Sequence, residues 1–325
     1  MPRRSCIFSP NLRLRSPRRF EPHSASCRLR AGLVTVSTVL VGYGLVLAAA
    51  GPRILTRSRW MDRAPHLAIA MWQAATASVL AAALLVALRG HYAGIGQPLV
   101  AMTGLGIAFA LCAWTGIHLA RGFVGAVRER RLHANMLAPI AYHDPDLGAL
   151  VVEHDRPLAY CLPGRVRRIV VTSGVIQRLD AEQLAAVLAH ERAHLFGRHH
   201  LAVTTAEALA RAFPFVPLFR TAADEIAHCV ELAAADVAAR RHDSRVIAAA
   251  VLCIAGAPIP RSALGASGQR VARRVRRMLT QHPPLGRIAR TGSATVIIGL
   301  LAAPGIIAAN PAIAATLDRH CPIPL

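Results

Sequence analysis

Long apolar stretches that carry no charged residue dominate the pattern of this sequence. Four of them hold no Asp, Glu, Lys or Arg over about 20 residues, which is long enough for a helix to cross about 30 Å of hydrocarbon. They occupy residues 31–50, 66–88, 98–120 and 294–315. We therefore predict about four transmembrane helices, three of them in the first 120 residues.

The pattern changes to that of a water-soluble domain over residues 121–293. Short β-branched and apolar runs at 150–153, 158–161 and 168–172 predict strands, because Asp, Pro and Gly turn signals separate them. From Asp180 onward the chain is Ala-rich and helical in pattern, and Asp180 with Gln183 three residues later predicts a capping box. The fold class expected is an α-helical membrane protein with an α+β domain.

The two ends of the chain differ from these segments. Residues 1–30 hold eight arginines together with Pro and Ser, a composition that predicts disorder. Residues 316–325 form a short tail after the fourth apolar stretch.

Arginine distribution predicts the sides of the membrane. The segments 51–64 and 121–131 carry four arginines each, whereas the loop 89–97 and the tail carry one each. The positive-inside rule therefore places residues 121–293 in the cytoplasm. Strict alternation then puts the arginine-rich N-terminus outside, so either the first stretch does not span or translation starts further in, near Val34.

The net charge of +21 does not indicate a nucleic-acid binder. All 38 basic residues are arginine, which is typical of a GC-rich genome, and aromatic residues make up only 5% of the chain. We expect attraction to anionic lipids and no nucleic-acid partner. The seven cysteines are scattered without a CxxC pair, so no disulfide framework is expected.

A metal-binding pattern lies on the helix that follows Asp180. His190 and His194 are four residues apart, so they share one helix face about 6 Å apart along the axis and both imidazoles reach one ion. Glu191 beside them is placed to act as general base toward a water whose pKa zinc lowers. The sequence HERAH therefore predicts a catalytic zinc site.

A third protein ligand is needed, and the sequence offers alternatives. Glu231 is favoured, because a lone carboxylate stands on an otherwise Ala- and Leu-rich helix face; His228 is its competitor. Residues 190–200 also satisfy HExxHxxGxxH, the metzincin pattern, with Gly197 as the bend and His200 as ligand. Otherwise His199 and His200 are a pair at a helix end.

Several motifs together resemble a known group of enzymes. LAYCLPG at 158–164, IVVTSG at 169–174, HERAH, ELAAAD at 231–236 and HPPLGRI at 282–288 occur in this order. They resemble membrane zinc metallopeptidases of the BlaR/MecR type and the related HtpX and CAAX-prenyl-protease group.

The resemblance implies a zincin-like (gluzincin) domain that hydrolyses protein or peptide substrates. It implies one Zn²⁺ ion held by His190, His194 and Glu231, with Glu191 as the base. It also points to His282 as a donor to the substrate carbonyl or the developing oxyanion. The chain departs from the usual ExxxD pattern, because position 235 is Ala and the acid is Asp236. Only about ten residues follow the last stretch, so no β-lactam sensor domain is expected.

We thus expect a multi-pass cell-membrane zinc endopeptidase that acts in regulatory proteolysis or in turnover of membrane proteins. A metzincin-like protease is one alternative. The other is a non-catalytic signalling or scaffold protein with a vestigial zinc site, against which the intact Glu191 argues.

Overall fold

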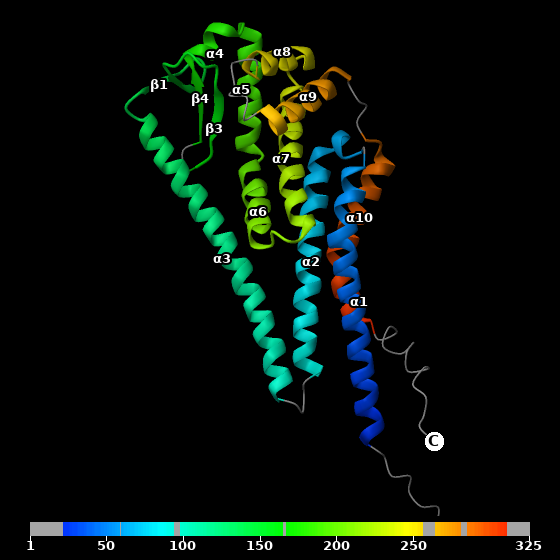
Figure 1. Cartoon of the computed structure of the whole chain (residues 1–325). Helices are drawn as coiled ribbons and strands as arrows, with labels where there is room; N and C mark the ends of the chain where they lie inside the picture. The colour runs from blue at the N-terminus through cyan, green and yellow to red at the C-terminus, as the bar shows by residue number, and fades with distance from the viewer. Residues whose placement is uncertain are drawn as a thin grey trace, which may run out of the picture.

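A computed structural model of the chain describes residues 22–58, 60–93, 98–164, 167–255, 264–280 and 285–310. In these ranges the protein is mostly helical, with one small sheet at one end of a set of long helices (Figure 1). The long helices are α1 (Pro22–Thr56), α2 (Pro65–Ala93), α3 (Pro98–Leu137) and α10 (Arg287–Ala309).

All four long helices contain a segment that is long and apolar enough to cross a membrane. These segments are Val36–Thr56, Pro65–Arg89, Pro98–Leu137 and Arg287–Ala309. The prediction of about four transmembrane helices together with a small sheet is therefore confirmed at the level of fold class.

Two helices run beyond the limits that the pattern predicted. Helix α1 already begins at Pro22, within the stretch for which the sequence predicted disorder; proline is well suited to a first helical position. Helix α3 does not end near residue 120 but continues to Leu137, two residues before Pro139. The residue before a proline avoids the helical conformation, which accounts for the stop at this point.

The sheet has the strand order β1-β2-β4-β3. Strands β2 (Ala149–Val152) and β4 (Arg168–Thr172) pair in parallel, and β3 (Ala159–Leu162) pairs antiparallel with β4. These are the three strands that the sequence predicted, within one residue. The pattern missed β1 (Ala141–Asp144), which forms a hairpin with β2. The feature that could have indicated β1 is the turn at 144–148, where the Asp144 carboxylate accepts two backbone N–H groups and Gly148 has φ of 59°.

Helix α5 (Ala181–Phe196) lies beside β3, the edge strand of this sheet. Apolar side chains of the sheet and of α5 form one buried cluster, including Val151, Val171, Leu184 and Leu188. The face of α5 that carries the histidines is therefore fixed relative to an edge strand that has one free side.

Between α5 and α10 the described residues form four helices: α6 (His199–Ala212), α7 (Pro217–Ala238), α8 (Ser244–Ala255) and α9 (Leu264–Thr280). Two short helices precede α5: η1 (Met61–Arg63) between α1 and α2, and α4 (Ser173–Arg178) directly before α5. Helix α7 packs against the first half of α2, where Trp72, Leu218 and Ile226 share a buried cluster. In Figure 1 the pair α6 and α7 accordingly lies between α2 and α3.

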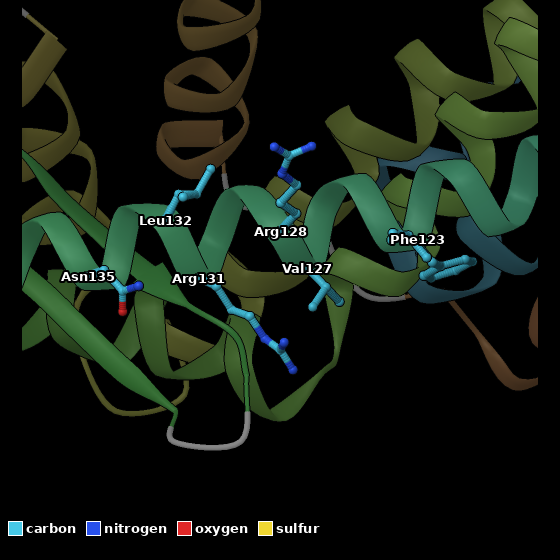
Figure 2. A pocket seen from close by; sticks show the side chains of 7 residues that line it. Phe123, Val127, Arg128, Arg131, Leu132 and Asn135 are labelled. Atoms are coloured by element: carbon cyan, nitrogen blue, oxygen red, sulfur yellow. The ribbon is translucent and has the colours of Figure 1, made fainter.

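The final part of α3 presents basic and apolar side chains together. A shallow depression of about 380 Å³ is lined there by α3 residues alone, among them Phe123, Arg128, Arg131 and Leu132 (Figure 2). None of these residues belongs to the histidine-bearing helix α5, so the depression is separate from the predicted metal site.

Candidate metal centre

Helix α5 begins with the capping box that the sequence predicted. The Asp180 carboxylate accepts the N–H of Gln183, and the Gln183 side chain accepts the N–H of Asp180. This arrangement satisfies two of the free N–H groups at the helix start. The helix then runs without interruption to Phe196 and places His190 and His194 one turn apart on the side that faces α7.

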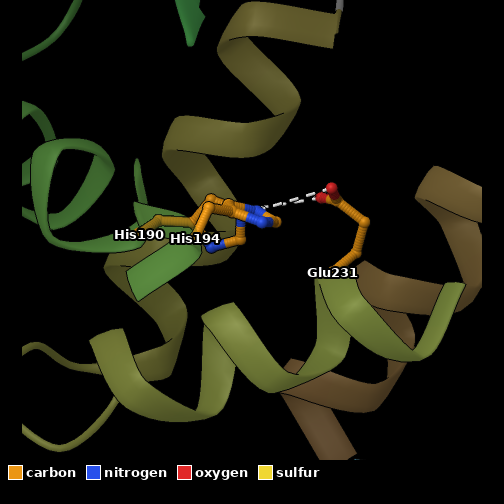
Figure 3. Close-up of side chains that lie close together, drawn as sticks. All are labelled: His190, His194 and Glu231. Carbon is orange, nitrogen blue, oxygen red and sulfur yellow. Dashed lines mark hydrogen bonds and ion pairs between the residues drawn. The ribbon is translucent and has the colours of Figure 1, made fainter. Parts of the chain in front are cut away.

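Three predicted ligands converge between α5 and α7. The Nε2 atoms of His190 and His194 lie 3.1 Å apart. Glu231 of α7 reaches both, with Oε2 at 3.6 Å from His190 Nε2 and Oε1 at 3.5 Å from His194 Nε2. Figure 3 shows the two imidazoles and the carboxylate pointing toward one another from the two helices.

These separations fit the coordination sphere of a single ion. A tetrahedral zinc ion with bonds of about 2.1 Å holds its ligand atoms roughly 3.4 Å apart. The candidate ligand atoms of all three residues lie within 4.8 Å of one another. Two imidazole nitrogens and one carboxylate are a donor set that zinc accepts in catalytic sites, and such a set leaves a fourth position open.

The protonation states suit metal binding. Burial lowers the pKa of His194 to about 4, so its ring is neutral at pH 7 and has a lone pair to offer. Burial alone would raise the pKa of Glu231. The hydrogen bond with His190 and the charge of Arg274 outweigh it and lower that pKa to about 2.

Glu191 lies beside the cluster and is half-buried. Burial, reinforced by the charge of Glu231, raises the pKa of Glu191 to about 7, although His190 opposes this shift. The thiol of Cys161, on the edge strand β3, is in hydrogen-bonding contact with the Glu191 carboxylate. Burial and that carboxylate raise the pKa of Cys161 to about 12, so the thiol keeps its proton and acts as the donor. Glu191 is thus held between the metal ligands and the edge strand.

His199 lies directly behind His194. The two Nδ1 atoms are 3.1 Å apart, and the ring of His199 is buried. With Nε2 of His194 bound to a metal ion, its Nδ1 would carry the proton that His199 accepts. The contact needs a glycine at position 197, since a Cβ there would lie 2.3 Å from His199 Nε2.

The helix ending differs from the one that the sequence suggested. The chain bends at Arg198, which has a left-handed φ of 49°, whereas Gly197 is right-handed. His199 and His200 therefore start α6 and do not end α5. His200 lies near Arg130 and Arg198, and the group of converging ligands does not include it. The structure thus gathers the ligand set with Glu231 and not the metzincin set.

Two arginines of α9 bind acids of α7. Arg274 Nη1 donates to Oε2 of Glu231, at the centre itself. One turn on, Arg277 makes a two-point contact with Asp236, with distances of 2.6 and 2.9 Å. Asp236 is thereby held by α9. His190 Nδ1 is buried and has no hydrogen-bond partner among the residues that the structure describes.

The other sequence candidates lie elsewhere. His228 is buried, and its Nε2 is 3.7 Å from Asp62 Oδ1 in the connection between α1 and α2. His282 lies outside the described residues.

Sequence reasoning missed three residues of this centre: Cys161, His199 and Arg274. Only His199 had a signal that could have been used, because it follows His194 by five residues across a glycine. Cys161 and Arg274 come from a strand and a helix whose approach to α5 depends on the tertiary fold.

Known proteins match the part of the chain that carries most of this centre. No solved structure matches the chain. A protease HtpX homolog of Aquifex aeolicus is 29% identical over 150 residues, which is 41% of this chain and 47% of that protein, so the match spans about half of its length. Residues 127–256, which include His190, His194 and Glu231, match the model of peptidase family M48, so this part of the chain is similar to that family.

Proposed function

We propose that this protein is a membrane-bound zinc endopeptidase that hydrolyses protein substrates. The observation that carries the proposal is the convergence of His190, His194 and Glu231 beside a half-buried Glu191. A structural zinc site has no need of an additional carboxylate of this kind beside its ligands. The M48 match and the four apolar helices support a membrane-associated metallopeptidase.

His190, His194 and Glu231 would hold the metal. Zinc supplies Lewis acidity toward the carbonyl and the attacking water. Glu191 would take a proton from the water that attacks the peptide carbonyl carbon, and it would then deliver that proton to the amine nitrogen as the C–N bond breaks. His199 fixes the ring of His194, and Arg274 fixes the carboxylate of Glu231, so the ligands are oriented before the substrate arrives.

The edge strand β3 gives the substrate a place to bind. It pairs with β4 on one side, its other side is paired with no described strand, and the thiol of its Cys161 contacts Glu191. An extended peptide adds to such an edge as a further strand. Recognition through backbone groups makes selectivity for side chains loose, which suits either a regulatory substrate or damaged membrane proteins.

Glu191→Gln tests the catalytic assignment. Glutamine keeps the shape of the side chain but accepts no proton from water, so we expect proteolysis to be lost while zinc stays bound. Self-cleavage and hydrolysis of an unfolded protein substrate are measured on detergent-purified wild type and variant, with zinc counted by elemental analysis.

Three results bear on this assignment. Full activity in Glu191→Gln with stoichiometric zinc refutes the role of Glu191. A wild-type protein that holds one zinc ion but cleaves nothing favours the non-catalytic scaffold. A protein that binds no zinc removes the metal centre altogether.

A further inference from the structure

The connection between α6 and α7 is strongly apolar. From Ala212 to Phe219 the sequence is AFPFVPLF, and an arginine stands at each end, at 211 and 220. Phe215 is 95% exposed, whereas Phe213 and Phe219 contact each other with ring centroids 5.1 Å apart. Nothing in the described part of the domain covers the Phe215 side chain.

The turn lies against candidate membrane spans on two sides. Trp114 of α3 donates its indole N–H to Ala212 O at 2.9 Å. Trp114 is within the uncharged part of α3, seven residues before Arg121, or about 10 Å along the axis. On the other side, Leu218 lies 3.6 Å from the position of a Cβ on Gly51, within the apolar segment Val36–Thr56 of α1.

The course of α6 places the turn deeper in the membrane than Arg121, the first charged residue of α3. Ala208 meets α3 at Gly122, where a Cβ would lie 3.0 Å from the Ala208 methyl group. Ala212 lies one turn further, about 6 Å along α6 toward the apolar half of α3. The four residues of the turn then lie beyond Ala212, alongside the uncharged part of α3 (Figure 1).

Several backbone N–H groups in and beside the turn have partners within the protein. Phe213 N–H donates to Leu209 O, Val216 N–H to Phe213 O, and Phe219 N–H to Val216 O. The prolines at 214 and 217 have no N–H group, and the carbonyl of residue 212 accepts a hydrogen bond from Trp114. Non-helical backbone exposed to lipid does not occur in the hydrocarbon core, so we expect the turn at the boundary between headgroups and acyl chains.

We propose that the α6–α7 turn, residues 213–216, is inserted into the bilayer, with Phe215 in contact with lipid acyl chains. The arginines at 211 and 220 extend back toward the headgroups, as long cationic side chains do at the edge of hydrocarbon. The turn joins the helix that begins with His199 to the helix that carries Glu231. Since Glu231 lies about 22 Å along α7 from the turn, insertion fixes the height of the metal centre above the membrane.

Depth-sensitive labelling tests the proposal in the full-length chain reconstituted in vesicles. Single cysteines replace Phe215, Phe109 and Arg241 in a background without the native cysteines, and each carries an environment-sensitive fluorophore. Phe109 is 74% exposed within the candidate span of α3 and serves as the lipid control, and Arg241 is exposed beyond the opposite end of α7 and serves as the water control.

We expect the label at 215 to match that at 109, with blue-shifted emission and quenching by acyl-chain-bound quenchers but not by iodide. A label at 215 that behaves like that at 241 overturns the proposal. Shielding from both quenchers also overturns it, because a second copy or another protein then covers Phe215. If the label at 109 reports water, α3 does not span and the proposal falls with it.

A second measurement uses the unmodified protein and needs no activity. Lipids with a photoreactive acyl chain are activated in the vesicles, and trypsin then releases the peptide 212–220 between its flanking arginines. Adducts on this peptide support insertion. Adducts on the α3 peptide ending at Arg121 but none on 212–220 contradict it. Neither result depends on whether the protein cleaves a substrate.

Discussion

Glu231 is the residue that joins the two helices of the centre, because its two oxygens reach both imidazoles and Arg274. We therefore predict that Glu231→Ala lowers zinc affinity by a factor of a hundred or more, on the order expected for losing one of three ligands. His200→Ala leaves affinity unchanged, because His200 lies among arginines outside the cluster. Competition with a chromophoric chelator measures both. If His200→Ala lowers zinc affinity and Glu231→Ala does not, the metzincin arrangement is correct.

Arg274 acts on the same carboxylate without binding the metal. Its donation to Oε2 leaves Oε1 as the oxygen directed at His194 and the ion. Removing a partner of this kind costs about tenfold to a hundredfold in metal affinity. We predict such a loss for Arg274→Met and partial recovery for Arg274→Lys, measured by the same chelator competition.

Arg277→Met is the matched control for that prediction. It removes the same charge from the same helix and breaks the contact with Asp236, but it leaves the bond between Arg274 and Glu231 in place. We expect lower thermal stability with unchanged zinc affinity. If Arg274→Met instead tightens zinc binding, Arg274 competes with the metal for Glu231 and does not orient it.

At the scale of elements, the junction of α5 and α6 decides how His194 is supported. We predict that Gly197→Ala lowers zinc affinity by about tenfold, because the new methyl group displaces the His199 ring and His194 loses its partner. The φ of Gly197 is −70°, which alanine adopts freely, so contact alone carries the effect. Gly125→Ala, with nothing within 4 Å in α3, is the control. Equal zinc affinity in both variants would show that His199 has no positioning role.

The same junction shows what a sequence pattern predicts and what it does not. The capping box at Asp180 and the spacing of His190 and His194 are local features, so the start of α5 and its ligand face were predictable. The metzincin alternative placed the bend at Gly197, but the bend occurs at Arg198, and the glycine is instead needed to admit the His199 ring. That requirement arises only once α6 has folded back.

The strands and the partners of the metal ligands show the same difference between local features, which were predictable, and contacts that depend on the tertiary fold. The three strands with apolar runs were predicted within one residue, whereas β1, with the sequence AYHD, has no such run and depends on the Asp144 turn. The pairing of Arg274 with Glu231 joins residues 43 positions apart. Nothing in the local pattern of α9, which has arginines on several positions, distinguishes Arg274 from its neighbours.

At the scale of the molecule, basic residues collect at one end of the apolar helices. Arg128 and Arg131 extend from the end of α3 on which the sheet lies (Figure 2), and α1 ends and α2 and α10 begin toward this same end (Figure 1). Arginines near a membrane surface are attracted to anionic lipids, by about 1 kcal/mol each. This distribution favours a cytoplasmic location of the M48-like domain.

We predict that a reporter fused after Arg131, in place of the rest of the chain, is active only if it is one that works in the cytoplasm. Four arginines in 51–64 and four in 121–131 oppose one each in 89–97 and after residue 315, and acidic residues such as Asp62 count for little in this rule.

The eight arginines of residues 1–30 oppose this orientation if all four stretches span. Removing residues 1–30 should therefore leave orientation and activity unchanged, since the candidate span of α1 starts at Val36. An active periplasmic-type alkaline phosphatase at Arg131 in the trimmed chain would place the metal centre outside the cytoplasm. The search for substrates would then move to extracytoplasmic proteins.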